Sequence, residues 1–267
     1  MFTLLSIAQP ETLQDAYKVL TAKKSNAILG GCAYLRMGSQ TIHTGVDLSK
    51  LGLDFIKEHD TYIEIGAMAS LRDVETNSAI NKCFSGVLSK SVRSIIGVQF
   101  RNVATVGASV FSRYGFSDFL TALMALDTEV ELYKGGRLTL AEFMDMPRAK
   151  DILIKVIIHK TNRTAAYLTL RNSQSDYPVL TVAVSRLDAD WKIAVGARPT
   201  RAKLAAQAAV LLANAGSDVT PDVLEQAAKI AAEELPFGAN MRASAEYRSA
   251  MCKTLVKRAI AEVAACR

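Results

Sequence analysis

Two glycine-containing segments hold the residues whose type and spacing suit ligand chemistry. In the first, the short apolar run Ala27–Leu29 is followed at once by Gly30 and Gly31. Glycine has no Cβ, so the backbone of such a turn can approach another group closely. The second, residues 106–118, has no clear hydrophobic period and contains glycines, serines and one aspartate. We expect a long ordered loop there, and because loops of this length usually have a function, both segments are candidate binding sites.

The other reactive residues indicate neither hydrolysis nor metal binding on this chain. The histidines have no metal-ligand spacing and no paired nucleophile, and no two cysteines lie within four residues of each other. There is also no G-x-S-x-G, Walker or G-x-G-x-x-G motif. We therefore assign no catalytic and no metal-binding residue, and favour redox chemistry supplied by a bound cofactor, which the protein has only to bind, orient and tune. The residues considered are His43, His59, His159, Cys32, Cys83, Cys252 and Cys266.

Composition narrows the class of protein further. The chain has 267 residues, half of them hydrophobic and 22% charged, which is enough for a sizeable core and argues against general disorder. The formal charge is +6, but Lys and Arg are scattered, so we expect no nucleic-acid partner. No apolar run approaches the ~18–20 residues that span a bilayer, so we expect no membrane association. The start lacks signal-peptide features, and a cytoplasmic protein with reduced cysteines is expected.

The elements that must position the two segments follow from periodicity. Helical spacing is expected over residues 11–22 and across most of residues 78–96. Ser70 and Asp73 have the spacing of a capping box, which predicts a short helix there. Short or alternating apolar runs predict strands over residues 27–29, 62–67, 129–133 and 152–158, with a hairpin turn at residues 134–137.

The last hundred residues change in character. Three strands are expected over residues 165–170, 179–187 and 191–195, followed by three helices. These helices are expected over residues 200–215, from an N-cap at Thr220 with Pro221 at the first position, and over residues 244–265. The fold class is therefore α+β in at least two domains, with a boundary near residues 160–163.

Three segments, taken in order, resemble the flavin subunit of the xanthine dehydrogenase and carbon monoxide dehydrogenase family of molybdenum hydroxylases. Residues 27–37, AILGGCAYLRM, are similar to that family's A-G-G-T-D-L loop. Residues 99–109, QFRNVATVGAS, are similar to its I-R-N-x-A-T-I-G-G-N loop and run on without a gap to Ser117 and Asp118. Residues 241–248, MRASAEYR, match its R-A-S-A-E-Y-R signature. Each glycine motif alone is weak, but their order and spacing match over nearly the whole chain.

The resemblance implies a specific architecture. It implies a two-part, PCMH-like FAD-binding domain over residues 1–160, split near residue 55. It also implies a C-terminal domain over residues 161–267, made of a three-stranded antiparallel sheet and a helix bundle. The coarse assignment of the last hundred residues leads independently to the same arrangement.

The resemblance also implies the cofactor and the residues that hold it. FAD carries a pyrophosphate, which backbone N–H groups of a glycine-rich turn can bind, and hydroxyls suit its ribityl chain. Asp118 would lie near the adenine or ribityl end, although it could also cap the helix that follows it. The implied FAD-binding residues are Leu29, Gly30, Gly31, Cys32, Ala33, Tyr34, Thr105, Gly107, Ala108, Ser109, Ser112 and Asp118.

Several positions depart from the family pattern. Cys32 stands where Thr is usual, and a thiol is a weaker hydrogen-bond donor than a hydroxyl. Ala33 replaces an acidic residue, Ala108 a second glycine and Ser109 an asparagine. Thr169 stands where the family commonly has lysine, so a cation near the flavin or the nicotinamide would be missing.

Other residues keep two interpretations. Arg101 and Asn102 either fix their loop or touch phosphate, and a structural salt bridge is the alternative for Arg101. Tyr167 packs either on the flavin or, as we favour, in the sheet. Arg242 and Glu246 are expected to hold the helix bundle together.

The function implied by the resemblance is an oxidoreductase subunit for electron transfer. Molybdenum cofactor on a large subunit would hydroxylate the substrate, with xanthine or a related purine favoured. Electrons would pass through 2Fe-2S clusters on a small subunit to FAD on this chain, and then to NAD or another acceptor. The alternative is a flavin-free scaffold subunit of the same kind of complex, as the altered loop residues would allow. A basic nucleic-acid module is supported only by the net charge.

Overall fold

The computed structural model describes residues 1–216 and 219–265, so Cys266 lies outside the described residues. They form two compact units that interleave along the chain. The second unit takes two segments from the first half of the sequence, and the domain boundary near residue 160 stays a prediction. The first unit comprises Met1–Asp73, Val98–Ser112 and Thr128–Ile158; the second comprises Val74–Gly97, Arg113–Asp127 and the described residues of His159–Arg267.

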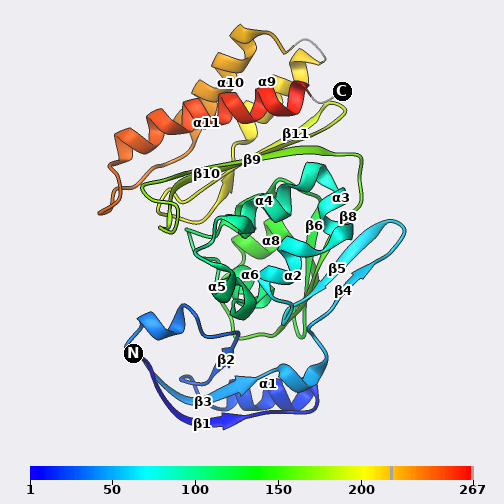
Figure 1. Ribbon diagram of the computed structural model, residues 1–267, viewed down its shortest axis with the longest axis vertical. Helices are drawn as coiled ribbons and strands as arrows, with labels where there is room; N and C mark the ends of the chain where they lie inside the picture. The colour runs from blue at the N-terminus through cyan, green and yellow to red at the C-terminus, as the bar shows by residue number, and fades with distance from the viewer. Residues whose placement is uncertain (217–218, 266–267) are drawn as a thin grey trace. The chain divides into compact units, whose positions relative to one another are not determined.

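The first unit contains a small parallel sheet with strand order β1-β3-β2 (Figure 1). Helix α1 packs on one face of it, where Ala16 and Leu20 meet Val46 in a buried cluster. Because the strands are parallel, β2 and β3 end at the same edge, and the first glycine loop leaves from there. The elements are β1 (Thr3–Ala8), α1 (Leu13–Ala22), β2 (Ala27–Leu29), the 3-10 helix η1 (Leu35–Met37), β3 (Thr41–Asp47) and the 3-10 helix η2 (Ser49–Leu51).

A five-stranded sheet, with order β4-β5-β8-β6-β7, completes the first unit. The β6–β7 hairpin is fixed by the Asp151 carboxylate, which accepts hydrogen bonds from the backbone N–H groups of Lys134 and Gly135. The expected capping box is present, because Ser70 and Asp73 each accept from the other's backbone N–H. The elements are β4 (Ile56–Glu58), β5 (Tyr62–Gly66), α2 (Leu71–Thr76), α5 (Val98–Val103), α6 (Val106–Phe111), β6 (Thr128–Leu132), β7 (Gly136–Thr139), α8 (Leu140–Asp145) and β8 (Leu153–His159).

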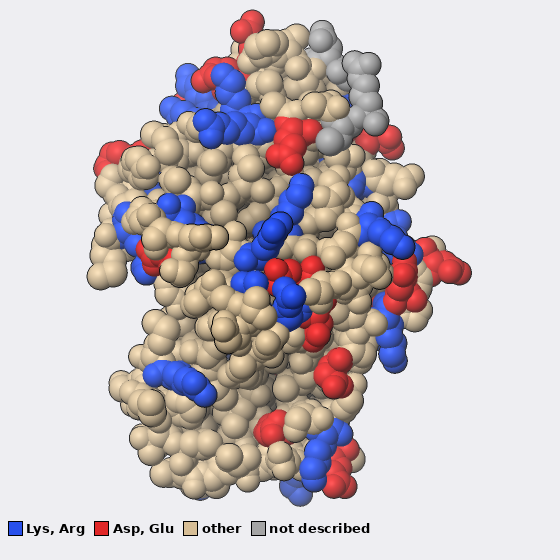
Figure 2. Space-filling view, viewed as in Figure 1, with Lys and Arg blue, Asp and Glu red and all other residues tan. Residues whose placement is uncertain are grey.

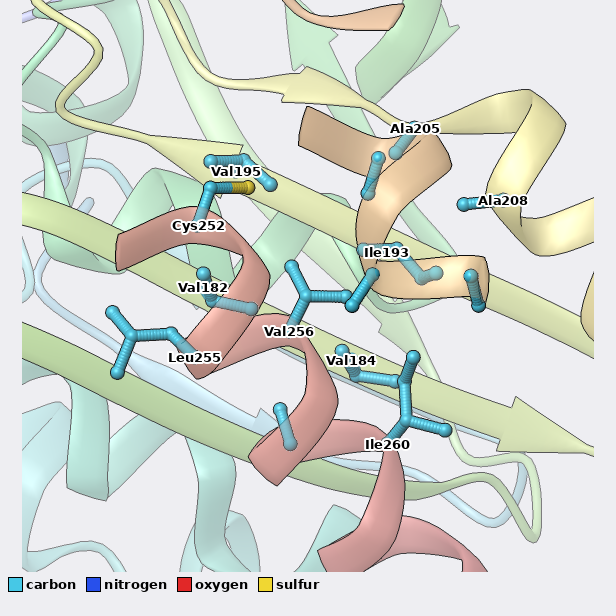
Figure 3. Close-up of a cluster of buried hydrophobic side chains, with 14 of the residues drawn as sticks. Val182, Val184, Ile193, Val195, Ala205, Ala208, Cys252, Leu255, Val256 and Ile260 are labelled. Atoms are coloured by element: carbon cyan, nitrogen blue, oxygen red, sulfur yellow. The ribbon is translucent and has the colours of Figure 1, made fainter. Parts of the chain in front are cut away.

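An antiparallel sheet of order β12-β11-β10-β9 is the centre of the second unit. Strand β10 is buried on both faces, because alternate side chains point to opposite sides. Val182 and Val184 pack against α9–α11, as Figure 3 shows, while Thr181 bonds Thr121 of α7 on the other face. The elements are α3 (Ser78–Lys82), the 3-10 helix η3 (Phe84–Gly86), α4 (Val87–Arg93), α7 (Asp118–Met124), β9 (Thr164–Arg171), β10 (Pro178–Leu187), β11 (Asp190–Gly196), β12 (Lys203–Leu204), α9 (Ala206–Ala215), α10 (Pro221–Glu234) and α11 (Ala245–Ala265).

Most expected elements are confirmed to within a few residues, and three expectations are wrong in detail. The C-terminal sheet has four strands among the described residues, because the short β12 pairs with β11. Helix α9 begins at Ala206 rather than near residue 200 for the same reason. Residues 106–118 are not one loop, because they contain the short helix α6. Within residues 1–216 and 219–265, no helix is both long and apolar enough to cross a membrane.

Candidate cofactor site

The first glycine loop, defined here as residues 30–34, is a turn with left-handed backbone. Gly31 has φ +72 and Cys32 has φ +57, so the chain reverses directly after β2. The backbone N–H groups of Gly31, Cys32 and Ala33 make no hydrogen bond to any described residue. Successive free N–H groups in a turn form a concave donor surface that suits an anion such as phosphate.

The second loop, residues 105–112, satisfies its own backbone donors. Thr105 caps helix α6 by accepting from the Ala108 N–H, and the N–H of Gly107 donates to the carbonyl of Ala67. The N–H groups of Val106 and Ser109 also have protein acceptors. What this loop can offer a ligand is therefore hydroxyl groups rather than a row of free amides.

Glycines allow the first loop to pack directly on the end of α5 and on the second loop, and the second loop to pack on Ala67. A Cβ on Gly31 would lie 1.8 Å from the carbonyl oxygen of Val103, and one on Gly30 would lie 2.9 Å from both the Ala108 methyl and the Thr105 hydroxyl. A Cβ on Gly107 would similarly meet the Ala67 carbonyl at 2.8 Å. The structure brings the two sequence motifs together within the first unit, and glycine is required at the contact between them.

Two departures from the family pattern have visible consequences. Ala108 supplies the methyl group that faces Gly30, so its side chain fills part of the space between the loops. Burial raises the pKa of the Cys32 thiol, although the nearby Arg36 charge opposes the shift, so this side chain is held as a neutral thiol. Its positive φ is also strained for any residue with a Cβ.

Asp118 belongs to the second unit, where the sequence interpretation had not foreseen its partners. Its carboxylate accepts from the Tyr167 hydroxyl at 2.5 Å and from the Arg171 guanidinium at 2.5 Å. Burial raises the pKa of the Asp118 carboxyl, against the Arg171 charge and the Tyr167 hydrogen bond. Burial, together with the charge of Asp118, also raises the pKa of Tyr167 well above its ordinary value. The hydrogen bonds hold Asp118 in an internal network.

The helix-cap alternative for Asp118 is wrong by one residue, because Ser117 is the N-cap of α7 and accepts from Leu120. Tyr167 lies in the sheet, as favoured, with its hydroxyl on Asp118. Tyr167, Thr169 and Arg171 alternate along β9 and therefore share one face. The alternation could have placed Arg171 beside Tyr167, but it does not identify Asp118 as their common partner. Arg101 lies in α5, and its side chain is buried.

The C-terminal signature has a structural role in the second unit. Arg242 pairs with Asp176 at 2.8 Å, while Glu246 is an exposed residue in the first turn of α11. The residue that the sequence interpretation missed is Arg248, which is fully buried. Its guanidinium donates to the carbonyls of Val179, Gly238 and Ala243 and to the Asn240 side chain, and so joins β10 to the start of α11.

Figure 2 shows basic and acidic side chains interspersed on the visible face rather than gathered into one basic field. No group of three or more His, Cys, Asp or Glu side chains within residues 1–216 and 219–265 is arranged to hold a metal ion.

The residues of the first unit fit a phosphate-bearing cofactor. The free N–H groups of Gly31, Cys32 and Ala33 supply donors on the first loop, and the Ser112 hydroxyl, which has no hydrogen-bond partner among the described residues, is a further donor at the end of α6. The tight contact at Gly31 keeps this donor surface against the end of α5, just before the second loop. The arrangement therefore suits the phosphates of a dinucleotide.

Two protein-family models match the chain. Residues 2–161 match the FAD binding domain in molybdopterin dehydrogenase, and residues 165–263 match the CO dehydrogenase flavoprotein C-terminal domain. Together these matches cover almost the whole sequence, in the order that the three motifs indicate.

Individual relatives and solved structures agree with these models. The chain is 27% identical to the nicotine 6-hydroxylase medium subunit of Paenarthrobacter nicotinovorans, covering 97% of this chain and 96% of that one. It is 25% identical to the glyceraldehyde dehydrogenase medium chain of Sulfolobus acidocaldarius, covering 97% and 98%. Its fold is similar to that of a chain of quinoline 2-oxidoreductase from Pseudomonas putida 86, with a TM-score of 0.86, 20% identity, and 99% and 97% covered. A chain of reconstituted CO dehydrogenase from Oligotropha carboxidovorans gives a TM-score of 0.87 at 20% identity, with 100% and 99% covered.

Proposed function

This chain belongs to the family of FAD-binding subunits of molybdenum hydroxylases, and from that premise we propose that it passes electrons from a partner's iron–sulfur clusters to NAD or another acceptor. It is an oxidoreductase subunit that binds FAD. When bound, FAD supplies the redox chemistry, since it accepts electrons singly and releases them as a pair. The chain's own residues bind and orient that group.

One observation supports this proposal most directly. The first glycine loop presents three successive free N–H groups, and its left-handed turn is packed against the second loop. We propose that these N–H groups bind the FAD pyrophosphate, with Leu29, Gly30 and Tyr34 flanking them. We propose that hydroxyls of the second loop contact the rest of the cofactor. The second-loop residues are Thr105, Gly107, Ala108, Ser109 and Ser112.

The partners are proposed from the names of the relatives. Two of these proteins are named medium subunit or medium chain, which fits a complex with a small and a large partner. The cysteines of this chain are too dispersed in sequence for an iron–sulfur cluster, so we assign the clusters to the small partner and the molybdenum cofactor to the large one. Since the names of the relatives carry different substrates, we assign the choice of substrate to the large partner.

The test uses the full chain, purified with its flavin. On addition of NADH we expect the flavin's visible absorbance to bleach, and an added dye to be reduced continuously. If NAD is not the acceptor, as the absence of a lysine at Thr169 would allow, a chemical reductant of flavin should still support dye reduction. We expect no hydroxylation of nicotine, aldehyde or purine. Hydroxylation by the chain alone would contradict the proposed division of labour.

A flavin-free scaffold subunit is the second candidate. It is favoured by the second loop, where the N–H groups of Val106, Gly107, Ala108 and Ser109 all have protein acceptors. A natively purified complex in which this chain carries no flavin would establish the scaffold and exclude the electron-transfer role.

A further inference from the structure

An arginine that has no ion-pair partner among the described residues lies two residues after the first glycine loop. Arg36 lies in η1 (Leu35–Met37), and its backbone N–H donates to the carbonyl of Cys32 at 3.2 Å. The side chain is exposed and makes no ion pair or hydrogen bond with any described residue. Its positive charge reaches the loop, because it acts on the Cys32 thiol. Arg36 is therefore a free cation beside three free backbone donors.

Asp47, an acidic group whose charge acts on Cys32 in this loop, is already engaged. Asp47, at the end of β3, accepts from the Gln9 side chain at 2.8 Å and from the Ser49 N–H at 2.9 Å. Burial would raise the pKa of Asp47, but these hydrogen bonds hold it below its ordinary value, so the carboxylate is charged. It still forms no ion pair with Arg36 among the described residues. The guanidinium is left available for an anion from outside the chain.

The place in the fold also suits a ligand. In sheets of parallel strands, ligands bind beyond the carboxyl ends of the strands. Strands β2 and β3 pair in parallel with Leu29 opposite Asp47, so the first loop and η1 follow this edge. A guanidinium presents several donors in a fixed plane, which matches the geometry of phosphate oxygens.

Resting on the proposed function, we propose that Arg36 supplies the side-chain positive charge for the FAD pyrophosphate, beside the backbone donors of Gly31, Cys32 and Ala33. Arg36 lies four residues after Cys32. Its charged guanidinium adds hydrogen-bond donors beside a loop whose Cys32 thiol is only a weak donor. Arg36 is thus a binding residue for the cofactor and takes no part in electron transfer itself.

The test is the affinity of the deflavinated full chain for FAD, measured by fluorescence titration at low and high salt. Arg36→Gln should raise the Kd about tenfold at low salt, as for loss of a charged hydrogen bond. The difference should shrink at high salt because ions screen the charge. Arg36→Lys should recover most of the affinity. The matched control is Arg137→Gln, which removes the same charge from an exposed arginine paired with Glu129 in the β6–β7 hairpin, and it should behave as wild type.

Two results would overturn the role of Arg36 and leave the proposed function standing. One is an Arg36→Gln chain that binds FAD as tightly as wild type at low salt. The other is a loss that is equal at both salt concentrations and is not recovered by lysine, since that would mean that Arg36 only shapes the loop. A wild-type chain that binds no FAD at all would instead overturn the proposed function.

Discussion

At the scale of single residues, the structure changes the reason for the glycines. The sequence suggests that Gly31 leaves room for phosphate, but its missing Cβ faces the carbonyl of Val103. The glycine is needed so that the first loop can pack on the end of α5, and the free N–H groups follow from that turn. The positive φ of Cys32 could not be read from sequence, because residues with a Cβ seldom adopt it. A threonine at position 32 would be strained, because a β-branched side chain is disfavoured at positive φ.

The clash at Gly31 can be separated from its backbone conformation. Gly31→Ala and Gly52→Ala place a methyl group at similar positive φ, +72 and +61, but only the first meets the Val103 carbonyl. Both should lose about 1–2 kcal/mol of stability through left-handed backbone. Gly31→Ala should lose about 1–3 kcal/mol more through overpacking, and most of its FAD. Denaturant unfolding and flavin content are the measurements, and equal behaviour of the two variants would refute the loop contact.

At the scale of elements, the sequence predicted the helices and strands whose ends are marked by neighbouring cap or turn residues. The β2 strand, the capping box at Ser70 and the N-cap at Thr220 were recognisable because turn and cap residues lie next to an apolar period. Strand β12 and helix α6 were missed because both depend on distant partners. β12 is only two residues long and pairs with β11, whereas α6 is anchored by backbone bonds to Ala67 and Ala69.

A second element-scale feature joins α7 to the C-terminal sheet through an ion network. Asp127, just after α7, pairs with Lys192 of β11 at 2.5 Å and with Arg163 at 3.2 Å. Burial would raise the pKa of Asp127, but the hydrogen bonds and charges of Lys192 and Arg163 outweigh it and lower the pKa. The folded state therefore binds the proton less readily than the unfolded state does. The network's stabilisation is present above the ordinary value of 3.8 and is lost as pH falls through the lowered folded pKa.

This network makes stability depend on pH in one direction. Asp127→Asn should lower the free energy of unfolding by about 1–3 kcal/mol at neutral pH. The gap from wild type should narrow as the pH falls from 3.8 through the lowered folded pKa, because the wild-type carboxylate then also becomes neutral. Denaturant titrations across this range provide the measurement. Asp188→Asn, at an exposed aspartate of the same unit, is the control and should change little. A deficit that does not depend on pH would show that charge is not its cause.

At the scale of the whole molecule, the order of the three motifs along the chain identified the family better than any single motif. The two glycine motifs and the C-terminal signature identified the family, and matches over residues 2–161 and 165–263 confirm it. The interleaving of the two units could not be predicted, because it depends on which distant segments pack together. The internal partners of Asp118 were hidden for the same reason, since Arg171 lies 53 residues away in sequence.

We propose above all that this chain binds FAD at its first glycine loop. The most direct measurement is to purify the native complex without added flavin, denature it, and identify the released flavin by chromatography and mass spectrometry. The account predicts FAD in an amount equimolar with this chain. FMN alone, or no flavin from an intact complex, would contradict it.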